Sequence, residues 1–195
     1  MDCPQPLPCA VFLTAAFVLA GCTQTVWFRS RLSTPFRVPI DGRRSIGGKR
    51  IFGDNKTWSG FVVMVPAVGA AFLVLGLLRP LLPFQWRDGL WPLSPVDYCL
   101  LGCVVGFGFM AAELPNSFLK RRLGVEPGAA PGNPLASWIC FVIDRTDSII
   151  GGFLALALFV PVSFLTWVYV LVVGPGLHWS FSVLLYHLGV KARPA

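Results

Sequence analysis

The sequence contains few charged residues. Asp, Glu, Lys and Arg make up 13% of its 195 residues, whereas 55% are hydrophobic. A soluble globular protein of this size needs more polar surface than this composition supplies, so the sequence indicates an integral membrane protein. The chain length fits one polytopic domain over residues 1–195.

Histidine is also scarce, and both examples, His178 and His187, lie late in the chain. A Ser-His-Asp or Cys-His catalytic arrangement is therefore not indicated. Six cysteines give no clear metal site, since Cys99 and Cys103 share a helical face in an apolar segment where cysteine packs as a small hydrophobic residue.

The charges that are present are mainly basic. Sixteen Lys and Arg residues against nine Asp and Glu residues give a formal net charge of +7. The basic residues gather in the loops between apolar segments, as the positive-inside rule describes, so we expect no nucleic-acid partner. Membrane lipids and other phosphate groups are the partners that this charge favours.

Apolar runs predict an all-α integral membrane protein with about five transmembrane helices, because a helix needs about 20 apolar residues to cross the hydrocarbon core. The charge bias places loops 29–60 and 114–147 in the cytoplasm, and these two polar loops are expected to form the site. Pro161 is expected to kink the fourth helix, and residues 174–176 to turn the chain into the fifth. The expected spans are about 9–28, 61–78, 98–112, 148–173 and 177–190.

The segment Asp144-Arg145-Thr146-Asp147, here called the DxxD motif, sets two carboxylates and a guanidinium against the apolar run 149–173. If the motif is the first turn of a membrane helix, the two carboxylates share a face, with Cβ atoms roughly 5–6 Å apart. That spacing suits one hard cation. The alternative is that Arg145 neutralises one carboxylate and the helix N-terminus stabilises the other, so that the motif only marks the membrane boundary.

A second polar cluster, residues 53–57, has the components of a phosphate site. Gly53 lets the backbone approach an anion, Lys56 and Thr57 supply a cation and a hydroxyl, and Asp54 lies within reach of a metal. The spacing of a P-loop is missing, so a solvated cytoplasmic loop is the alternative.

A third cluster follows the expected third span. Asn116 and Lys120 share one face of a predicted helix, and Ser117 and Arg121 share the adjacent face, so donors and cations project toward the same space. A polyphosphate would fit there, and the alternative is a basic patch that only sets topology. With all three clusters expected at one membrane face, the sequence predicts metal-assisted chemistry on a phosphate at the lipid interface.

Three motifs in this order resemble the CDP-archaeol synthase family. Residues 39–42 with 49–60 are similar to that family's first cytoplasmic loop, and residues 116–124 with 144–148 are similar to the signature shared with CDP-diacylglycerol synthases. The tail, 177–191, is also similar to the family's last span. The resemblance covers nearly the full length after the first span.

The resemblance implies a cytidylyltransferase in the cell membrane that joins CTP to a lipid phosphate and releases pyrophosphate, with Mg²⁺ as its cofactor. Its active face would be cytoplasmic, and a homodimer is compatible with it. By position, Asp144 and Asp147 would hold the metal and, with Lys120, carry catalysis. The residues expected to bind nucleotide and phosphate are Asp54, Lys56, Thr57, Asn116, Ser117, Arg121 and Arg145.

The sequence departs from the family pattern at two places. The usual Asp-Gly-Gly-Arg is Asp41-Gly42-Arg43-Arg44 here. The usual closing Pro-Trp is residues 194–195, Pro-Ala.

Two other functions stay open at this point. A CDP-alcohol phosphotransferase also carries Asp pairs at a membrane face, but its motif continues into Gly and an Ala-Arg pair, whereas residues 148–151 are Ser-Ile-Ile-Gly. A transporter, or a non-enzymatic membrane protein that binds anionic lipid, would line a path with polar residues, and spans 61–78 and 148–173 have almost none.

Overall fold

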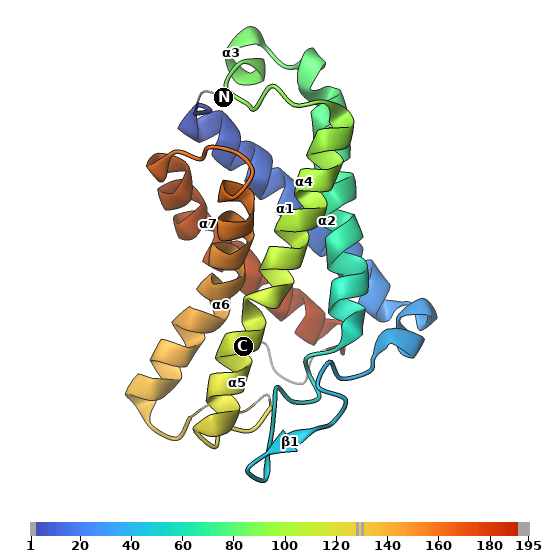
Figure 1. Cartoon of the computed structure of the whole chain (residues 1–195), viewed down its shortest axis with the longest axis vertical. Coiled ribbons are helices and arrows are strands. Elements are labelled where there is room, and N and C mark those ends of the chain that lie inside the picture. The colour runs from blue at the N-terminus through green and yellow to red at the C-terminus, as the bar shows by residue number, and fades with distance from the viewer. Residues whose placement is uncertain (1–2, 128, 130, 191–195) are drawn as a thin grey trace.

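The computed structural model describes residues 3–127, 129 and 131–190. Within these residues, five long helices form a bundle, and the connecting segments lie at its two ends (Figure 1). The long helices are α1 (Pro6–Arg29), α2 (Trp58–Leu78), α4 (Pro95–Ala111), α6 (Pro134–Ala157) and α7 (Phe164–His187). The short elements are the 3-10 helices η1 (Arg31–Phe36) and η2 (Arg79–Leu81), the strands β1 (Ser45–Ile46) and β2 (Lys49–Arg50), and the helices α3 (Phe84–Arg87) and α5 (Glu113–Arg122).

The helices confirm the predicted all-α membrane architecture. In the described residues, four helical segments are long and apolar enough to cross a membrane: Pro6–Arg29, Trp58–Leu81, Pro95–Arg122 and Phe164–His187. The helix α6 differs because it carries the three charges of the DxxD motif. The expected number of five spans stays a prediction.

The predicted span 148–173 is wrong in its bounds. The helix α6 ends at Ala157, and α7 begins only at Phe164. Pro161 separates the two helices instead of kinking one, because proline lacks a backbone N–H and disfavours helical conformation at the residue before it. The Ser163 side chain then caps α7 by accepting a hydrogen bond from the first turn.

The predicted turn at residues 174–176 is absent, so the expected span 177–190 is not separate. These residues lie inside α7, which continues to His187. An internal proline removes one helical hydrogen bond, and packing against neighbouring helices offsets that cost. Here Gly174 lies directly against the side chain of Ile149 in α6.

The predicted loop 114–147 is largely helical. The helix α5 continues to Arg122 and α6 begins at Pro134. The Asn133 side chain accepts hydrogen bonds from the first backbone N–H groups of α6, and proline suits the first helical position. The DxxD motif therefore lies near the middle of a helix, and its predicted place in a first turn is wrong.

The first loop, 29–60, contains η1 and a small hairpin. Strands β1 and β2 pair in an antiparallel register that sets Ser45 opposite Arg50. Arg43, just before the hairpin, has φ 62°, in the left-handed region that favours glycine. The family pattern has glycine at this position. The other departure, at residues 194–195, lies outside the described residues.

Small residues let α4 approach both of its neighbours. Gly102 faces the backbone of Val68 in α2, and Gly108 faces Gly151 in α6. A Cβ atom on Gly108 or Gly151 would overlap the other helix. This close crossing fixes α6 beside α4 and beside α5, which continues α4 (Figure 1).

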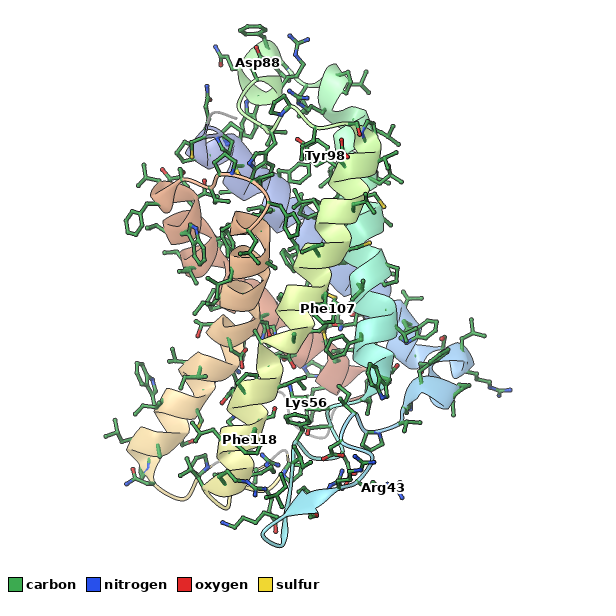
Figure 2. All side chains as sticks on the ribbon, viewed as in Figure 1. Arg43, Lys56, Asp88, Tyr98, Phe107 and Phe118 are labelled. Atoms are coloured by element: carbon green, nitrogen blue, oxygen red, sulfur yellow. The ribbon has the colours of Figure 1, made fainter. Side chains whose placement is uncertain are left out.

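Trp91 connects two chain segments at the end of the bundle opposite the β1–β2 hairpin. Its buried indole N–H donates to the carbonyl of Pro161 at 2.9 Å, and the Tyr98 hydroxyl donates to the carbonyl of Trp91 at 2.7 Å. Figure 2 shows Asp88 at this end, far from Lys56.

Candidate active site

The three predicted polar clusters meet at one end of the bundle. Figure 2 shows Lys56, Phe118 and Arg43 toward this end, which is also the end of the hairpin in Figure 1. The segment before α2, the helix α5 and the middle of α6 contribute the side chains. Residues far apart in the sequence therefore form one polar region.

Asn116 lies between the two carboxylates of the DxxD motif. Its amide nitrogen Nδ2 donates to Oδ1 of Asp144 at 2.7 Å and to Oδ2 of Asp147 at 2.8 Å. Lys120, one turn further along α5, forms an ion pair with Asp144. These donors offset the repulsion between two carboxylates on one helical face. The structure thus places the three residues predicted to be catalytic, Asp144, Asp147 and Lys120, in contact with or next to Asn116, which was predicted to bind nucleotide or phosphate.

Asp144 and Asp147 are carboxylates, a ligand type that Mg²⁺ prefers in proteins. Mg²⁺ commonly takes one or two protein carboxylates and completes its shell with substrate phosphates and water. In the part of the chain that the structure describes, no group of three or more His, Cys, Asp or Glu side chains forms a metal cluster. The other ligands of an ion held by Asp144 and Asp147 would therefore come from a phosphate substrate and water.

Two residues that the sequence reasoning missed, Glu113 and Ser148, belong to the same polar region. Lys56 forms an ion pair with Oε2 of Glu113, and both side chains are mostly buried. The Ser148 hydroxyl lies 2.9 Å from the other oxygen of Glu113 and 3.2 Å from Oδ1 of Asp147. The available signal was an acidic residue at the end of a Gly-rich apolar run, where charge is functional by default.

The burial and pairing of Lys56 act on its pKa in opposite directions. Burial lowers the pKa, but the charge of Glu113 and its hydrogen bond outweigh that effect, so the pKa lies above its ordinary value. Asp147 and Asp144 act in the same direction as Glu113. Lys56 is therefore a cation that lies within electrostatic reach of the DxxD motif.

Asp41 organises the first loop. Its buried carboxylate accepts hydrogen bonds from the Arg50 guanidinium at 2.8 Å and from the backbone N–H groups of Arg43, Phe52 and Gly53. Burial raises the pKa of Asp41, but these hydrogen bonds outweigh it and lower the pKa to about 2. The loop is thus folded around one ionised carboxylate.

Arg122 attaches this loop to α5. Its guanidinium donates to the backbone carbonyls of Ile46, Lys49 and Arg50, at 2.5 to 2.8 Å. In return, the Lys49 ammonium donates to the Arg122 carbonyl at 2.9 Å. Arg122 therefore positions the hairpin beside the site.

Two predicted phosphate-binding residues lie on the loop side of the site. Asp54 pairs with Arg50 at 2.8 Å, and its side chain is 67% exposed. Thr57 directly precedes α2, and its backbone pairs with Pro39. The structure places Thr57 beside Lys56 and places Asp54 next to the hairpin.

The remaining predicted residues are buried near Asp144. Arg121 and Arg145 are each only 7% exposed, and Ser117 is 8% exposed. Asp144 attracts both guanidinium groups electrostatically. Arg145 also stacks on Phe141, 3.3 Å from the ring centroid, and donates to the Phe141 carbonyl at 2.8 Å.

The two guanidinium groups retain hydrogen-bonding capacity. Among the buried side-chain atoms described, Nε and Nη1 of Arg121 and Nε of Arg145 have no hydrogen-bond partner. A buried cation with unmet N–H groups is costly unless an anion binds to it. Both side chains therefore suit a phosphate ligand.

A cavity of about 270 Å³ adjoins the polar region. Side chains from α1, α2, α4, α6 and α7 line it, and most of them are apolar. Its polar part includes Asn55, Lys56, Thr57 and Glu113. An apolar space in the bundle therefore reaches the Lys56–Glu113 ion pair.

Comparisons with known proteins identify the family. The family described as CarS-like, CDP-archaeol synthase, matches residues 33–194. A CDP-archaeol synthase of Halobacterium salinarum is 35% identical, and one of Halorubrum lacusprofundi is 38% identical; each match covers 80% of this chain and 82% or 83% of the relative. A Methanoculleus marisnigri CDP-archaeol synthase is 33% identical, over 80% of this chain and 89% of the relative.

A solved structure supports the fold. It is described as an intramembrane enzyme for archaeal membrane lipid biosynthesis, and it covers 88% of this chain and 90% of its own with a TM-score of 0.61 and 22% identity. These comparisons do not favour a CDP-alcohol phosphotransferase or a transporter. The chain belongs to the CDP-archaeol synthase family.

Proposed function

We propose that this chain is a magnesium-dependent cytidylyltransferase that converts CTP and a lipid phosphate into a CDP-lipid and pyrophosphate. Family membership supports the reaction class. The observation that carries the proposal to individual residues is Asn116 held between Asp144 and Asp147, beside Lys120. Because the relatives are named for CDP-archaeol, the proposed acceptor is an archaeol-type lipid phosphate.

The reaction needs no covalent enzyme intermediate. An oxygen of the lipid phosphate attacks the α-phosphorus of CTP and forms a new P–O bond. The bond from the α-phosphorus to the bridging oxygen breaks, and pyrophosphate leaves with that oxygen and the electron pair. The protein has to align the two phosphates and neutralise their charge.

The described side chains divide this work. Asp144 and Asp147 would hold Mg²⁺, which supplies charge neutralisation to the phosphate oxygens and the departing pyrophosphate. Lys120 and the buried Arg121 and Arg145 are the proposed partners of the CTP phosphates, because all three interact with Asp144. The other proposed contacts to CTP or the lipid phosphate are Asp54, Lys56, Thr57, Asn116 and Ser117.

The surroundings of the site support a lipid acceptor at the cytoplasmic face of the cell membrane. The mostly apolar cavity beside Lys56 suits hydrocarbon chains, and the hairpin end carries Arg43, Arg44 and Lys49, as expected of a cytoplasmic loop. A homodimer stays a prediction.

The test is to follow labelled CTP with purified protein, Mg²⁺ and an archaeol-type lipid phosphate. Label at the α-phosphorus should enter the lipid with release of pyrophosphate, and chelation of divalent cations should stop the reaction. Asp144→Asn and Asp147→Asn should each lower the rate by about 100-fold or more without preventing folding. Asp88→Asn, at the opposite end, is the matched control and should keep wild-type turnover. Transfer of label from the γ-phosphorus into the lipid would indicate a lipid kinase and overturn the proposal.

A further inference from the structure

Glu113 uses its two carboxylate oxygens for two different elements. Oε2 pairs with the ammonium of Lys56, from the loop before α2, and Oε1 accepts from the Ser148 hydroxyl of α6 at 2.9 Å. Glu113 itself begins α5, directly after the helix that crosses α6. One side chain thus links all three segments that build the site.

The two donors that Glu113 holds are also close to Asp147. The Ser148 hydroxyl is 3.2 Å from Oδ1 of Asp147, and its single proton can serve only one acceptor at a time. Lys56 lies within electrostatic reach of Asp147 and of Asp144. Without Glu113, the Ser148 hydroxyl would keep Asp147 as its acceptor, and the Lys56 ammonium would lose its ion pair in the vicinity of that carboxylate.

Pairing of Lys56 with Asp147 would affect cation binding directly. An ammonium paired with Asp147 occupies the oxygens that a divalent cation needs and opposes its charge. Residues that orient metal ligands without touching the metal commonly change metal affinity by about 10–100-fold when they are removed. Glu113 is placed to have an effect of this size, although its hydrogen bonds in the described part of the chain go to Lys56 and Ser148 and not to Asp144 or Asp147.

We propose that Glu113 is a positioning residue that holds the Lys56 ammonium in an ion pair and so keeps it from pairing with Asp147, one of the two proposed ligands of the divalent cation. The proposal rests on the cytidylyltransferase function proposed above. It assigns Glu113 an effect on cation affinity that is transmitted through Lys56. Lys56 can therefore act as an internal competitor of the cation when Glu113 is absent.

The experiment compares Glu113→Gln, Lys56→Met and the double variant with wild type. The purified full-length protein is titrated with Mn²⁺ in the absence of CTP, and EPR measures the dissociation constant of Mn²⁺. Glutamine can still accept from Ser148 but cannot form an ion pair with Lys56. Glu113→Gln should weaken Mn²⁺ binding by about tenfold. Lys56→Met alone should leave Mn²⁺ affinity at the wild-type value or tighter, and the double variant should return to within about threefold of wild type.

Two results would overturn the proposal. The first is unchanged Mn²⁺ affinity in Glu113→Gln, and the second is a double variant that binds Mn²⁺ as weakly as Glu113→Gln alone. If Glu113→Gln does not fold, Lys56→Met alone still tests the proposal, because Mn²⁺ binding weaker than that of wild type would overturn it. Because the readout is Mn²⁺ binding, it is separate from the labelled-CTP assay, and failure of the proposed reaction would leave this result interpretable.

Discussion

Asn116 and Asp147 lie 2.8 Å apart, measured from the amide nitrogen to the carboxylate oxygen Oδ2, although they belong to different helices. The same amide nitrogen also donates to Asp144. It therefore fills the space between the two carboxylates in which the proposed cation would bind. Cation binding and these two hydrogen bonds use the same oxygens.

Asn116→Asp should make the stability of the protein more dependent on magnesium. Without a divalent cation, three neighbouring carboxylates repel one another and Tm should fall below the wild-type value. With Mg²⁺, the third carboxylate adds a ligand, so the rise in Tm should exceed that of wild type. Tm is measured in detergent with EDTA and with MgCl₂. Asn133→Asp, which preserves the α6 cap, is the control, and an equal Mg²⁺ response in both variants would contradict the prediction.

Arg122→Lys should loosen the hairpin. A lysine ammonium cannot reproduce the planar group that reaches three carbonyls, and the lost charge-assisted hydrogen bonds should cost about 2 kcal/mol. Trypsin should then cleave within residues 43–50 about tenfold faster or more, since that energy corresponds to more than a factor of ten. Arg44→Lys keeps the cleavage site and should match wild type. Equal protection in both variants would show that Arg122 does not hold the hairpin.

The stabilisation from Asp41 should depend on pH. Its folded-state pKa of about 2 lies below the usual 3.8, so the ionised carboxylate stabilises the folded protein above about pH 3.8, and this contribution is lost as the pH falls toward 2. Asp41→Asn should therefore lower Tm most at pH 5–6, and the difference from wild type should narrow between pH 4 and pH 2. The control is Asp54→Asn, which changes the exposed carboxylate that also pairs with Arg50. A Tm difference that does not change with pH would exclude ionisation as the cause.

Arg43→Gly should stabilise the protein. Arg43 has φ 62°, a conformation that costs a residue with a Cβ atom about 1 kcal/mol relative to glycine. The expected result is a higher Tm, measured by thermal unfolding in detergent. Arg44→Gly is the matched control, and it should give no gain because Arg44 is not among the residues with positive φ. A lower Tm for Arg43→Gly would mean that the Arg43 side chain stabilises the loop.

The orientation of the site can be tested by cysteine labelling. In a background without native cysteines, a cysteine at Ile46 should react with a membrane-impermeant reagent only from the cytoplasm, and one at Asp88 only from outside. Asp88 lies at one end of the bundle (Figure 2), and the strand β1, which contains Ile46, lies at the other end (Figure 1); both residues are exposed. Labelling of Ile46 from outside would place the site on the other face of the membrane.

Composition and motif spacing were sufficient to predict the membrane class and to bring Asn116 and Lys120 together with the DxxD motif. The pattern worked at these residues because helical spacing alone places them on one face of α5. The first two spans were also close to α1 and α2, since the arginine-rich loop 29–60 lies between them. The same information could not decide whether the DxxD motif begins a helix or lies within one.

The errors have physical causes. Residues 148–190 are almost uniformly apolar, so no periodicity distinguishes the break at Pro161 from the continuous helix through Pro175; packing against other helices decides between them. Glu113 was missed because its partner Lys56 is 57 residues away in the sequence, and no local pattern links them. Ser148 was missed for the same reason, because its hydrogen-bond partner Glu113 lies on a different helix and 35 residues away in the sequence.

Gly108 in α4 and Gly151 in α6 are in direct contact where the two helices cross. The helix α4 continues into α5, which carries proposed phosphate-binding side chains, and α6 carries the proposed metal ligands. Metal–ligand distances tolerate errors of only about 0.2 Å, and a methyl group at this contact would separate the backbones by more than that. Gly108 and Gly151 should therefore tolerate little substitution, although they do not belong to the proposed substrate-binding residues. The parts of α1 and α7 that line the cavity contain none of the proposed metal ligands or phosphate-binding residues. For the proposed reaction, substitutions among these lining residues should therefore alter the fit of the lipid acceptor more than the positions of the proposed metal ligands.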